Sequence, residues 1–363
     1  MNWLAWRQHR KQFMIAGIFL ALFAAFMIPT GINFWHTYQH ALSTCHSFAT
    51  TADPRGTCDQ LSNELFQSQG DNLLFHLLPV AILFVPILLG LFWGVPFLAR
   101  EYAEGTNKLV WTQGVSRRKW LSVKLTWVLI GAATVAAGFT ALDTWWARAG
   151  NALNLWRFGP LQFGSQGIVL IGYAVFAVSI GVFFGAWFKR TMAAIGVTLV
   201  LLIAIVLILV PNFVRPYYYS PVTYRSSVLN SNGPSVAQTL VGNAATLDVS
   251  QTVVSKDNQP LNWSNPPQQC VVMPGSSPLA TIVGGHTIAA IPTKGGGSLA
   301  IESRNGGPPI DLNCLLPLGY QQEVKYQPSY RYWDFQRIET GMYLALSVIP
   351  LAGTYWLVLR RDA

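Results

Sequence analysis

Charged residues are scarce in this chain. Asp, Glu, Lys and Arg together make up 11% of its 363 residues, and 52% of the residues are hydrophobic. An ordinary soluble domain carries about 25% charged residues. This composition excludes an ordinary soluble domain and predicts an integral membrane protein.

Groupings that could carry out catalysis are also absent from the sequence. No GxxxxGK[ST] motif occurs, so the chain has no P-loop of its own for ATP phosphates. Acidic residues and histidines are scattered through loops, without a Ser/His/Asp, Cys/His or paired-carboxylate arrangement. We therefore predict no catalytic residue, no metal site and no cofactor in this chain.

Cysteines are few, and all four lie in two stretches outside the apolar runs: Cys45, Cys58, Cys270 and Cys314. None has the CxxC spacing of a zinc or redox site. Proximity favours Cys45 with Cys58 and Cys270 with Cys314, although four cysteines allow three pairings. Because disulfides persist only in oxidising compartments, we expect all four on the outer side of a membrane. Four unpaired thiols are the alternative.

Long apolar runs dominate the rest of the chain. A helix needs about 20 apolar residues to cross the hydrocarbon core. Six stretches meet this requirement: 13–35, 73–98, 121–146, 166–188, 192–213 and 338–359. Only Lys189, Arg190 and Thr191 separate the fourth from the fifth, which predicts a tight helical hairpin. The first run is too long for a signal peptide and lacks a cleavage site after Pro29, so we expect it to stay as an anchor.

The basic residues indicate how these spans are oriented. Thirteen Lys and Arg against three acidic residues fall on one side, at 7–11, 100–124, 189–190 and 360–362. The other side has 11 Lys and Arg against 12 acids. The positive-inside rule then predicts a multi-pass protein of the cell membrane with both termini cytoplasmic. This charge favours contact with anionic membrane lipids, and we infer no nucleic-acid partner from it.

The main insertion is 214–337. It opens with PYYYSP at 216–221, which places three tyrosines at the membrane boundary. Short β-branched runs follow at 246–254, 270–273, 281–291 and 298–303, separated by turn residues. The predicted fold class is an α-helical integral membrane protein with six transmembrane helices and a small β-rich extracellular domain inserted before the last span. The domains would be 1–213, 214–337 and 338–363.

The first residues, NWLAWRQHRKQ, mix tryptophans with basic side chains. This mixture is typical of a short helix lying in the headgroup layer, so we expect an elbow helix that enters the first span. A frayed cytoplasmic tail is the alternative.

The segment 100–124, REYAEGTNKLVWTQGVSRRKWLSVK, joins the second and third spans on the cytoplasmic side. Leu109, Val110 and Trp111 form an apolar patch, and the basic run that begins at Arg117 returns the chain to the headgroups. We expect a short helix held at the membrane at both ends. Such a helix can insert into a groove on a cytoplasmic protein and transmit movement.

Three separated stretches carry a resemblance to a known family. REYAEGTNKLVWTQGVSRRKWLSVKL resembles the segment of ABC type-2 transporter permeases in which E-x-x-E-G-T precedes a short helix, a Ser-Arg turn and a Lys at the next span. WLAWRQHRKQ and YQPSYRYWDFQRIE, at 326–339, resemble the actinobacterial branch of these permeases. The long outer domain departs from the plain six-span pattern.

This resemblance implies a division of labour between chains. The segment would be a coupling helix that docks into a separate ATP-binding subunit, which would hold ATP and Mg, and two permease chains would line the path as a homodimer or heterodimer. Glu101, Glu104, Gly105 and Thr106 would shape the coupling helix. Leu109, Val110, Trp111 and Arg117 would face the ATPase or the lipid.

Within the spans, three residues are candidates for a substrate path. Asp143, near the outer end of the third span, could bind a cationic substrate, or it is a boundary carboxylate neutralised by Arg148 or by water. Pro86 and Gly90 in the second span permit kinks along a moving pathway, or they serve packing. In the fourth span, Gly172, Gly181 and Gly185 favour close helix contact, within the chain or at a dimer seam.

Two functions follow from these observations. The first is the permease subunit of an ABC exporter that moves an amphipathic or hydrophobic compound with a separate ATP-binding subunit. The alternative is a membrane-anchored sensor or binding protein that captures a ligand in its disulfide-stapled outer domain.

Overall fold

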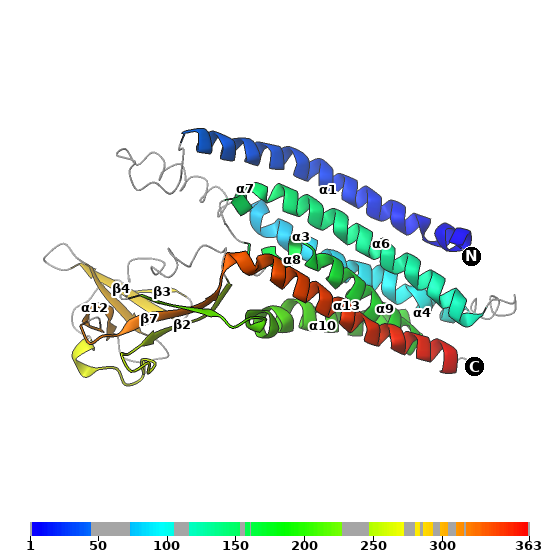
Figure 1. Ribbon diagram of the computed structural model, residues 1–363. Coiled ribbons are helices and arrows are strands. Elements are labelled where there is room, and N and C mark those ends of the chain that lie inside the picture. Colours follow the sequence, from blue (N-terminus) through cyan, green and yellow to red (C-terminus); the bar gives the residue numbers. More distant parts are fainter. Residues whose placement is uncertain are drawn as a thin grey trace. The chain divides into compact units, whose positions relative to one another are not determined.

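We describe the chain from a computed structural model (Figure 1). The described residues are 2–44, 73–104, 116–152, 157–159, 161–226, 247–271, 280–283, 286–292, 298–303, 310–315 and 317–361. The chain divides into two compact units, and each is described by itself. Unit 1 comprises Met1–Leu153, Pro160–Arg215 and Tyr332–Ala363, and unit 2 comprises Asn154–Gly159 and Pro216–Arg331.

Unit 1 is helical. Its first half contains α1 (Asn2–Thr44), α3 (Leu73–Leu89), the π-helix η1 (Gly90–Gly94), α4 (Val95–Glu104), α6 (Arg117–Trp146) and α7 (Arg148–Ala152). Its second half contains α8 (Gln162–Ser165), α9 (Val169–Phe188), α10 (Thr191–Leu202), the π-helix η2 (Ile203–Val214), α13 (Tyr332–Trp356) and the π-helix η6 (Leu357–Arg361). The short 3₁₀ helix η3 (Arg215–Tyr217) lies where unit 1 passes into unit 2.

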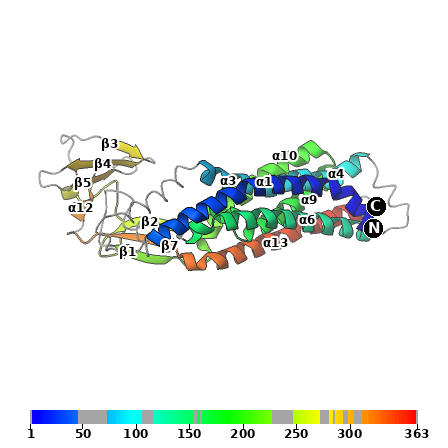
Figure 2. The same ribbon diagram turned by 90° about the horizontal axis from the view of Figure 1, so that it is seen from above.

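Six helices are long and apolar enough to cross a membrane, as the sequence predicted. They cover 10–40, 77–102, 117–146, 169–188, 191–217 and 329–360. The start of α1 and the end of the last span lie at the same end of unit 1 in both views (Figures 1 and 2). The end of α4 and the start of α6 also lie there (Figure 1). The chain is therefore a multi-pass helical protein whose termini share one side with the segment predicted to couple.

The N-terminal region differs from the expected elbow. Residues Asn2–Thr44 form one helix that includes Pro29, so no break separates an interfacial helix from the first span. The hydroxyl of Thr30 donates to the Phe26 carbonyl, 3.1 Å away, beside the point where Pro29 lacks an N–H donor. The apolar content that predicted a span here also allows the helix to continue through both regions.

The core of unit 1 is built around α9, which contacts α3, η1, α4, α6, α10 and α13. Its sequence, VLIGYAVFAVSIGVFFGAWF, has no charged residue and is apolar all round, which is typical of a helix surrounded by other helices. The turn into α10 is closed by Lys189 in the left-handed conformation, with φ of 52°. The predicted hairpin between the fourth and fifth spans is thus confirmed.

Glycines create the closest helix contact, where η1 and α4 cross α9. A Cβ on Gly181 would lie 2.3 Å from the carbonyl oxygen of Gly90, and a Cβ on Gly185 would lie 2.4 Å from that of Val95. Real Cβ atoms do not approach so closely, so the helices meet here backbone to backbone. Within this chain Gly181 and Gly185 therefore pack intramolecularly, one of the two alternatives that the sequence left open.

Unit 2 contains two antiparallel sheets. One has the order β1 (Val222–Ser226), β7 (Gln321–Gln327), β2 (Leu247–Val254), and the other the order β3 (Ala280–Val283), β4 (His286–Pro292), β5 (Ser298–Ser303), β6 (Ile310–Asp311). Short helical turns η4 (Gln268–Cys270), α12 (Leu312–Leu315) and η5 (Ser329–Arg331) complete it. The strands β2, β3, β4 and β5 lie on runs that the sequence predicted, so the described part of the insertion contains the small sheets expected there.

A disulfide joins Cys270 to Cys314, 44 residues apart, which confirms one predicted pairing. It lies in a small core where Leu261, Ile310 and Leu315 are buried and Trp263 packs against them. A core this small supports a fold better when a covalent link restricts the unfolded chain. Cys45 and Cys58 lie outside the described residues.

The central strand of the first sheet was not expected. β7 has the sequence QQEVKYQ, with Val324 as its one aliphatic residue. It pairs with β1 on one side and with β2 on the other, and Val324 is buried beside Tyr224 and Tyr326. Its position between two partners, rather than its own apolar content, makes it a strand.

Candidate functional site

An ion pair joins the two ends of the segment predicted to couple. Glu101, in the last turn of α4, accepts from the ammonium group of Lys124, in the second turn of α6. The Lys124 side chain is 8% exposed and that of Glu101 is 19% exposed. The Lys124 Nζ also lies 5.0 Å from the Trp120 ring centre and 5.4 Å from that of Phe97. Aromatic rings at these distances attract the ammonium group.

The start of α6 is fixed by a cap. Ser116 is extended, and its hydroxyl accepts from the backbone N–H of Lys119 at 3.4 Å. A serine at this position satisfies one of the free N–H groups of the first turn. Arg117 is the first residue of α6 and is half-buried. The Ser-Arg turn expected from the sequence is therefore the helix start.

The remaining residues predicted for coupling are only partly visible. Glu104 is the last residue of α4. Gly105, Thr106, Leu109, Val110 and Trp111 lie outside the described residues. Next to Glu101, Tyr102 holds its ring 4.9 Å from the Lys189 Nζ in the turn between α9 and α10. The end of α4 is thus attached both to α6 and to the α9–α10 hairpin.

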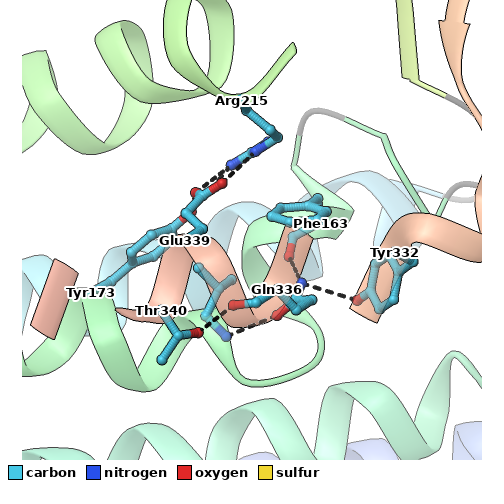
Figure 3. Close-up of polar contacts among 8 residues, drawn as sticks. Phe163, Tyr173, Arg215, Tyr332, Gln336, Glu339 and Thr340 are labelled. Carbon is cyan, nitrogen blue, oxygen red and sulfur yellow. Dashed lines mark hydrogen bonds and ion pairs between the residues drawn. The ribbon is translucent and has the colours of Figure 1, made fainter. Parts of the chain in front are cut away.

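A second, more deeply buried cluster lies where η2 ends and α13 begins (Figure 3). The Arg215 guanidinium binds the Glu339 carboxylate through two contacts, Nε to Oε2 at 2.8 Å and Nη2 to Oε1 at 2.9 Å. Tyr173 of α9 donates its hydroxyl to Glu339 and accepts from Arg215 Nη2 at 3.2 Å. The Phe163 ring covers Arg215 at 4.1 Å.

These groups are almost completely buried: Arg215 is 2% exposed, Tyr173 1% and Glu339 0%. A buried charge is tolerated when it is paired and its other hydrogen-bonding groups find partners. The bidentate geometry and the tyrosine meet this condition. The cluster therefore fixes the end of the fifth span to the fourth and the last.

Gln336, one turn before Glu339, ties α13 to the start of α9 (Figure 3). Its Oε1 accepts from the backbone N–H groups of Ile168 and Val169, both at 2.9 Å. Its Nε2 donates to the Phe163 carbonyl at 2.9 Å. Gly167 has φ of +75°, and a Cβ there would lie 2.6 Å from Gln336 Oε1, so only glycine fits this approach. The amide thus caps a buried helix start.

Sequence reasoning missed this cluster. Glu339 is the second residue of the predicted last span, where an ionisable residue is a functional candidate by default, and Arg215 follows the fifth span directly. That signal was present in the sequence. The pairing itself was not, because 124 residues separate the two side chains.

Asp143 is placed differently from the expectation that Arg148 neutralises it. Asp143 is 1% exposed, and its carboxyl lies beside Ser165. Asp143 and Arg148 are both described in the structure, and they form no ion pair with each other. The Arg148 guanidinium instead lies 4.4 Å from the Trp35 ring centre and 4.8 Å from that of Trp145. A cation between two indole rings is a stable arrangement without a carboxylate.

The other two candidates for a substrate path lie at helix contacts. Gly90 faces the backbone of Ala177 on α9, with a Cβ position 2.8 Å from its carbonyl oxygen. Pro86 is buried in α3.

Among the described residues no group of three or more His, Cys, Asp or Glu could hold a metal ion.

Unit 1 also contains an apolar cavity of about 550 Å³ between α1, α3, η1 and α6. Gln12 is its one polar lining residue; the others are aliphatic or aromatic. A cavity with such a lining can receive an apolar group and offers no selection by hydrogen bonding beyond Gln12.

Comparison with known proteins identifies the helical part of the chain. A family model described as ABC-2 membrane transporter related matches residues 17–215. No curated protein and no solved structure matches the chain. The matched residues make up more than half of the sequence. They include three spans completely and most of two others, together with the Glu101–Lys124 pair and Arg215. The chain therefore belongs to the ABC-2 membrane transporter related family.

Proposed function

We propose that this chain is the permease subunit of an ABC exporter that moves an amphipathic or hydrophobic compound. Family membership indicates a membrane-spanning transport subunit that works with an ATP-binding subunit. In this proposal ATP and Mg bind the partner subunit, a second permease chain completes the path, both termini are cytoplasmic, and unit 2 is extracellular. The cell is bacterial, of the actinobacterial branch that the sequence resembles.

The observation that carries the proposal is the Glu101–Lys124 pair. It closes the base of the segment between α4 and α6, so a force applied to that segment reaches both helices. Tyr102 and Lys189 extend the connection to the α9–α10 hairpin. A short segment that is held rigidly at both ends suits the transfer of movement from an ATPase to the spans.

The small number of polar groups in the spans supports a hydrophobic or amphipathic cargo. A path lined by aliphatic and aromatic side chains gains from transferring apolar surface out of water. A strongly polar cargo would need more hydrogen-bonding partners than these spans offer.

The test is co-expression of the tagged chain with its candidate ATP-binding subunit, followed by gentle purification and ATPase measurement. We expect a stable complex whose ATPase activity falls in Glu101→Gln and recovers in the exchanged pair Glu101→Lys/Lys124→Glu. The matched control is Arg118→Gln, which changes an exposed side chain in the first turn of α6. A chain that purifies alone, without ATPase activity, would contradict the proposal.

The second candidate function is a membrane-anchored sensor. The Cys270–Cys314 disulfide and the core around it favour this alternative, because they give unit 2 an ordered centre of its own. Ligand binding to the full chain would distinguish this alternative. Binding should be lost in Cys270→Ser/Cys314→Ser and should not change when the ATP-binding subunit is removed.

A further inference from the structure

The cavity in unit 1 has the dimensions of a single acyl chain. On α1 it is lined by Gln12, Ile15, Ala16, Phe19 and Phe23, whose spacing of three and four residues places them on one helix face. From Gln12 to Phe23 this face extends about 16 Å, at 1.5 Å per residue. The hydrocarbon core of a bilayer is about 30 Å thick, so the cavity is about as deep as one leaflet.

The cavity is open on one side, where the lining side chains of Phe19 and Phe92 are 64% and 61% exposed. Its volume of about 550 Å³ is lined almost entirely by aliphatic and aromatic groups, so an extended hydrocarbon chain from the surrounding lipid suits it without further hydrogen-bonding partners.

Aromatic contacts hold this space open at both ends. Phe13 meets Trp93 edge to face with ring centres 5.3 Å apart, and Phe23 meets Phe139 at 5.1 Å. Between these contacts α1 rests on α6, where Leu20 fills the space above Gly138. Between α1 and α3 the lining includes Ala16 of α1 and Ala81 of α3, whose small side chains leave the space between the two helices unfilled.

The polar end of the cavity is next to a cation. Lys11 lies one turn before Ile15, at the edge of the lining face, and its side chain is exposed. Side chains on a helix lean toward its N-terminus, so Lys11 extends away from the apolar part and toward the headgroup depth. Arg10 lies on the opposite face of the helix. Of the cations whose side chains the structure describes at this end, Lys11 is the one nearest the lining face, so a phosphate above the Gln12 end of the cavity can pair with it.

We propose that this cavity binds one acyl chain of an anionic phospholipid, drawn from the leaflet next to the N-terminal end of α1, with the phosphate at Lys11. The lining supplies the apolar site, and the lysine supplies the preference for an anionic headgroup. This binding does not depend on the proposed export function. The occupant is a resident membrane lipid rather than the transported compound.

The experiment is photo-crosslinking of the full chain in vesicles. Trace phosphatidylglycerol or phosphatidylcholine, each with a diazirine in the acyl chain, is activated by light, and labelled peptides are mapped by mass spectrometry. We expect phosphatidylglycerol to label both 15–23 and 81–93. Lys11→Gln should reduce the labelling by phosphatidylglycerol relative to that by phosphatidylcholine about fivefold, the weight of one basic residue near an anionic headgroup. Arg10→Gln, on the opposite face of α1, should reduce this ratio clearly less.

Filling the cavity provides the second readout. Ala16→Phe places a ring in the cavity and should reduce labelling to background, and Ala16→Leu serves if the larger variant folds poorly. Ala21→Phe, on the exposed opposite face of α1, should leave labelling unchanged. Equal labelling by the two headgroups, or full labelling of both Ala16 variants, would overturn the proposal. Loss of labelling when ATP is added to the complex with the ATP-binding subunit would also overturn it, in favour of transported cargo.

Discussion

Each end of the helical unit contains an ion pair, and the two pairs differ in how deeply they are buried and in how many groups hold them. The Glu101–Lys124 pair is partly exposed and is surrounded by rings, and it adjoins the segment that we propose to contact a partner. The Arg215–Glu339 pair is buried, bidentate and held by Tyr173. Both pairs are costly to break, and the completely buried one is the costlier, because its remaining charge would have no solvent and no partner. We infer that the first end moves with the partner and that the second end is an anchor.

Breaking the buried pair should have the largest effect. Arg215→Met would leave the Glu339 carboxylate buried without its partner, which costs about 3–5 kcal/mol of unfolding free energy. The measurement is denaturant-induced unfolding of the purified chain in detergent. Arg337→Met is the matched control, because Arg337 and its partner Asp334 are 72% and 47% exposed. The double change Arg215→Met/Glu339→Leu should recover part of the loss, and no recovery would argue against the pair as the cause.

The glycine contact between the two ends should come next. Gly181→Ala would force a methyl group against the Gly90 carbonyl and should destabilise unit 1 by about 1–3 kcal/mol. Gly196→Ala is the matched control, since a Cβ there meets nothing within 4 Å. In that open helical position alanine should be neutral or slightly stabilising. Similar unfolding free energies for the two variants would mean that η1 and α9 do not meet as closely as described.

The partly exposed pair should matter more for coupling than for stability. Glu101→Gln should lower the unfolding free energy less than Arg215→Met does, because the Glu101 side chain is 19% exposed whereas both members of the Arg215–Glu339 pair are almost completely buried. The same change should reduce ATPase-driven transport strongly if the pair fixes the segment between α4 and α6. Measuring unfolding and ATPase activity on the same preparation separates the two. A large loss of stability with normal activity would reverse the comparison between the ends.

The smallest effect should be the pH dependence of an ion pair in unit 2. Hydrogen bonds from Arg225, assisted by the charge of Lys325, lower the pKa of Glu323 below its ordinary value of 4.5. A lowered folded-state pKa stabilises the fold above pH 4.5 and loses this contribution as the pH falls through the folded-state value. Hydrogen exchange of the β7 amides, corrected for intrinsic rates, should therefore show weaker protection in acid. Glu323→Gln should remove this dependence of amide protection on pH. If the variant keeps the same pH dependence, a group other than Glu323 causes it.

Hydropathy predicted the helical part well, because a span must satisfy its backbone polar groups through its own hydrogen bonds. The turn at Lys189 and the pairing of Cys270 with Cys314 followed from local spacing in the same way. Contacts between distant elements were not predictable. The Arg215–Glu339 pair depends on the register of three packed helices, and β7 becomes a strand through its two neighbours.

The fate of Asp143 and Arg148 illustrates the same limit. Five residues apart in sequence, they suggested an ion pair, yet Arg148 lies between Trp35 and Trp145. Trp35 belongs to α1, and no pattern in the sequence around it predicts that it lies beside α7. The residues that shape the predicted coupling helix were recognised only through family resemblance, and their roles remain predictions.

The most direct test of the account is a crosslink between the segment 100–124 and the ATP-binding subunit. A photoreactive amino acid at Trp111 would be compared with the same residue at Ser43, an exposed position near the far end of α1. We predict that Trp111 crosslinks to the ATP-binding subunit, more weakly when Glu101→Gln is also present, and that Ser43 does not. A crosslink from Ser43, or none from Trp111 in an active complex, would contradict the proposal that this segment couples the two subunits.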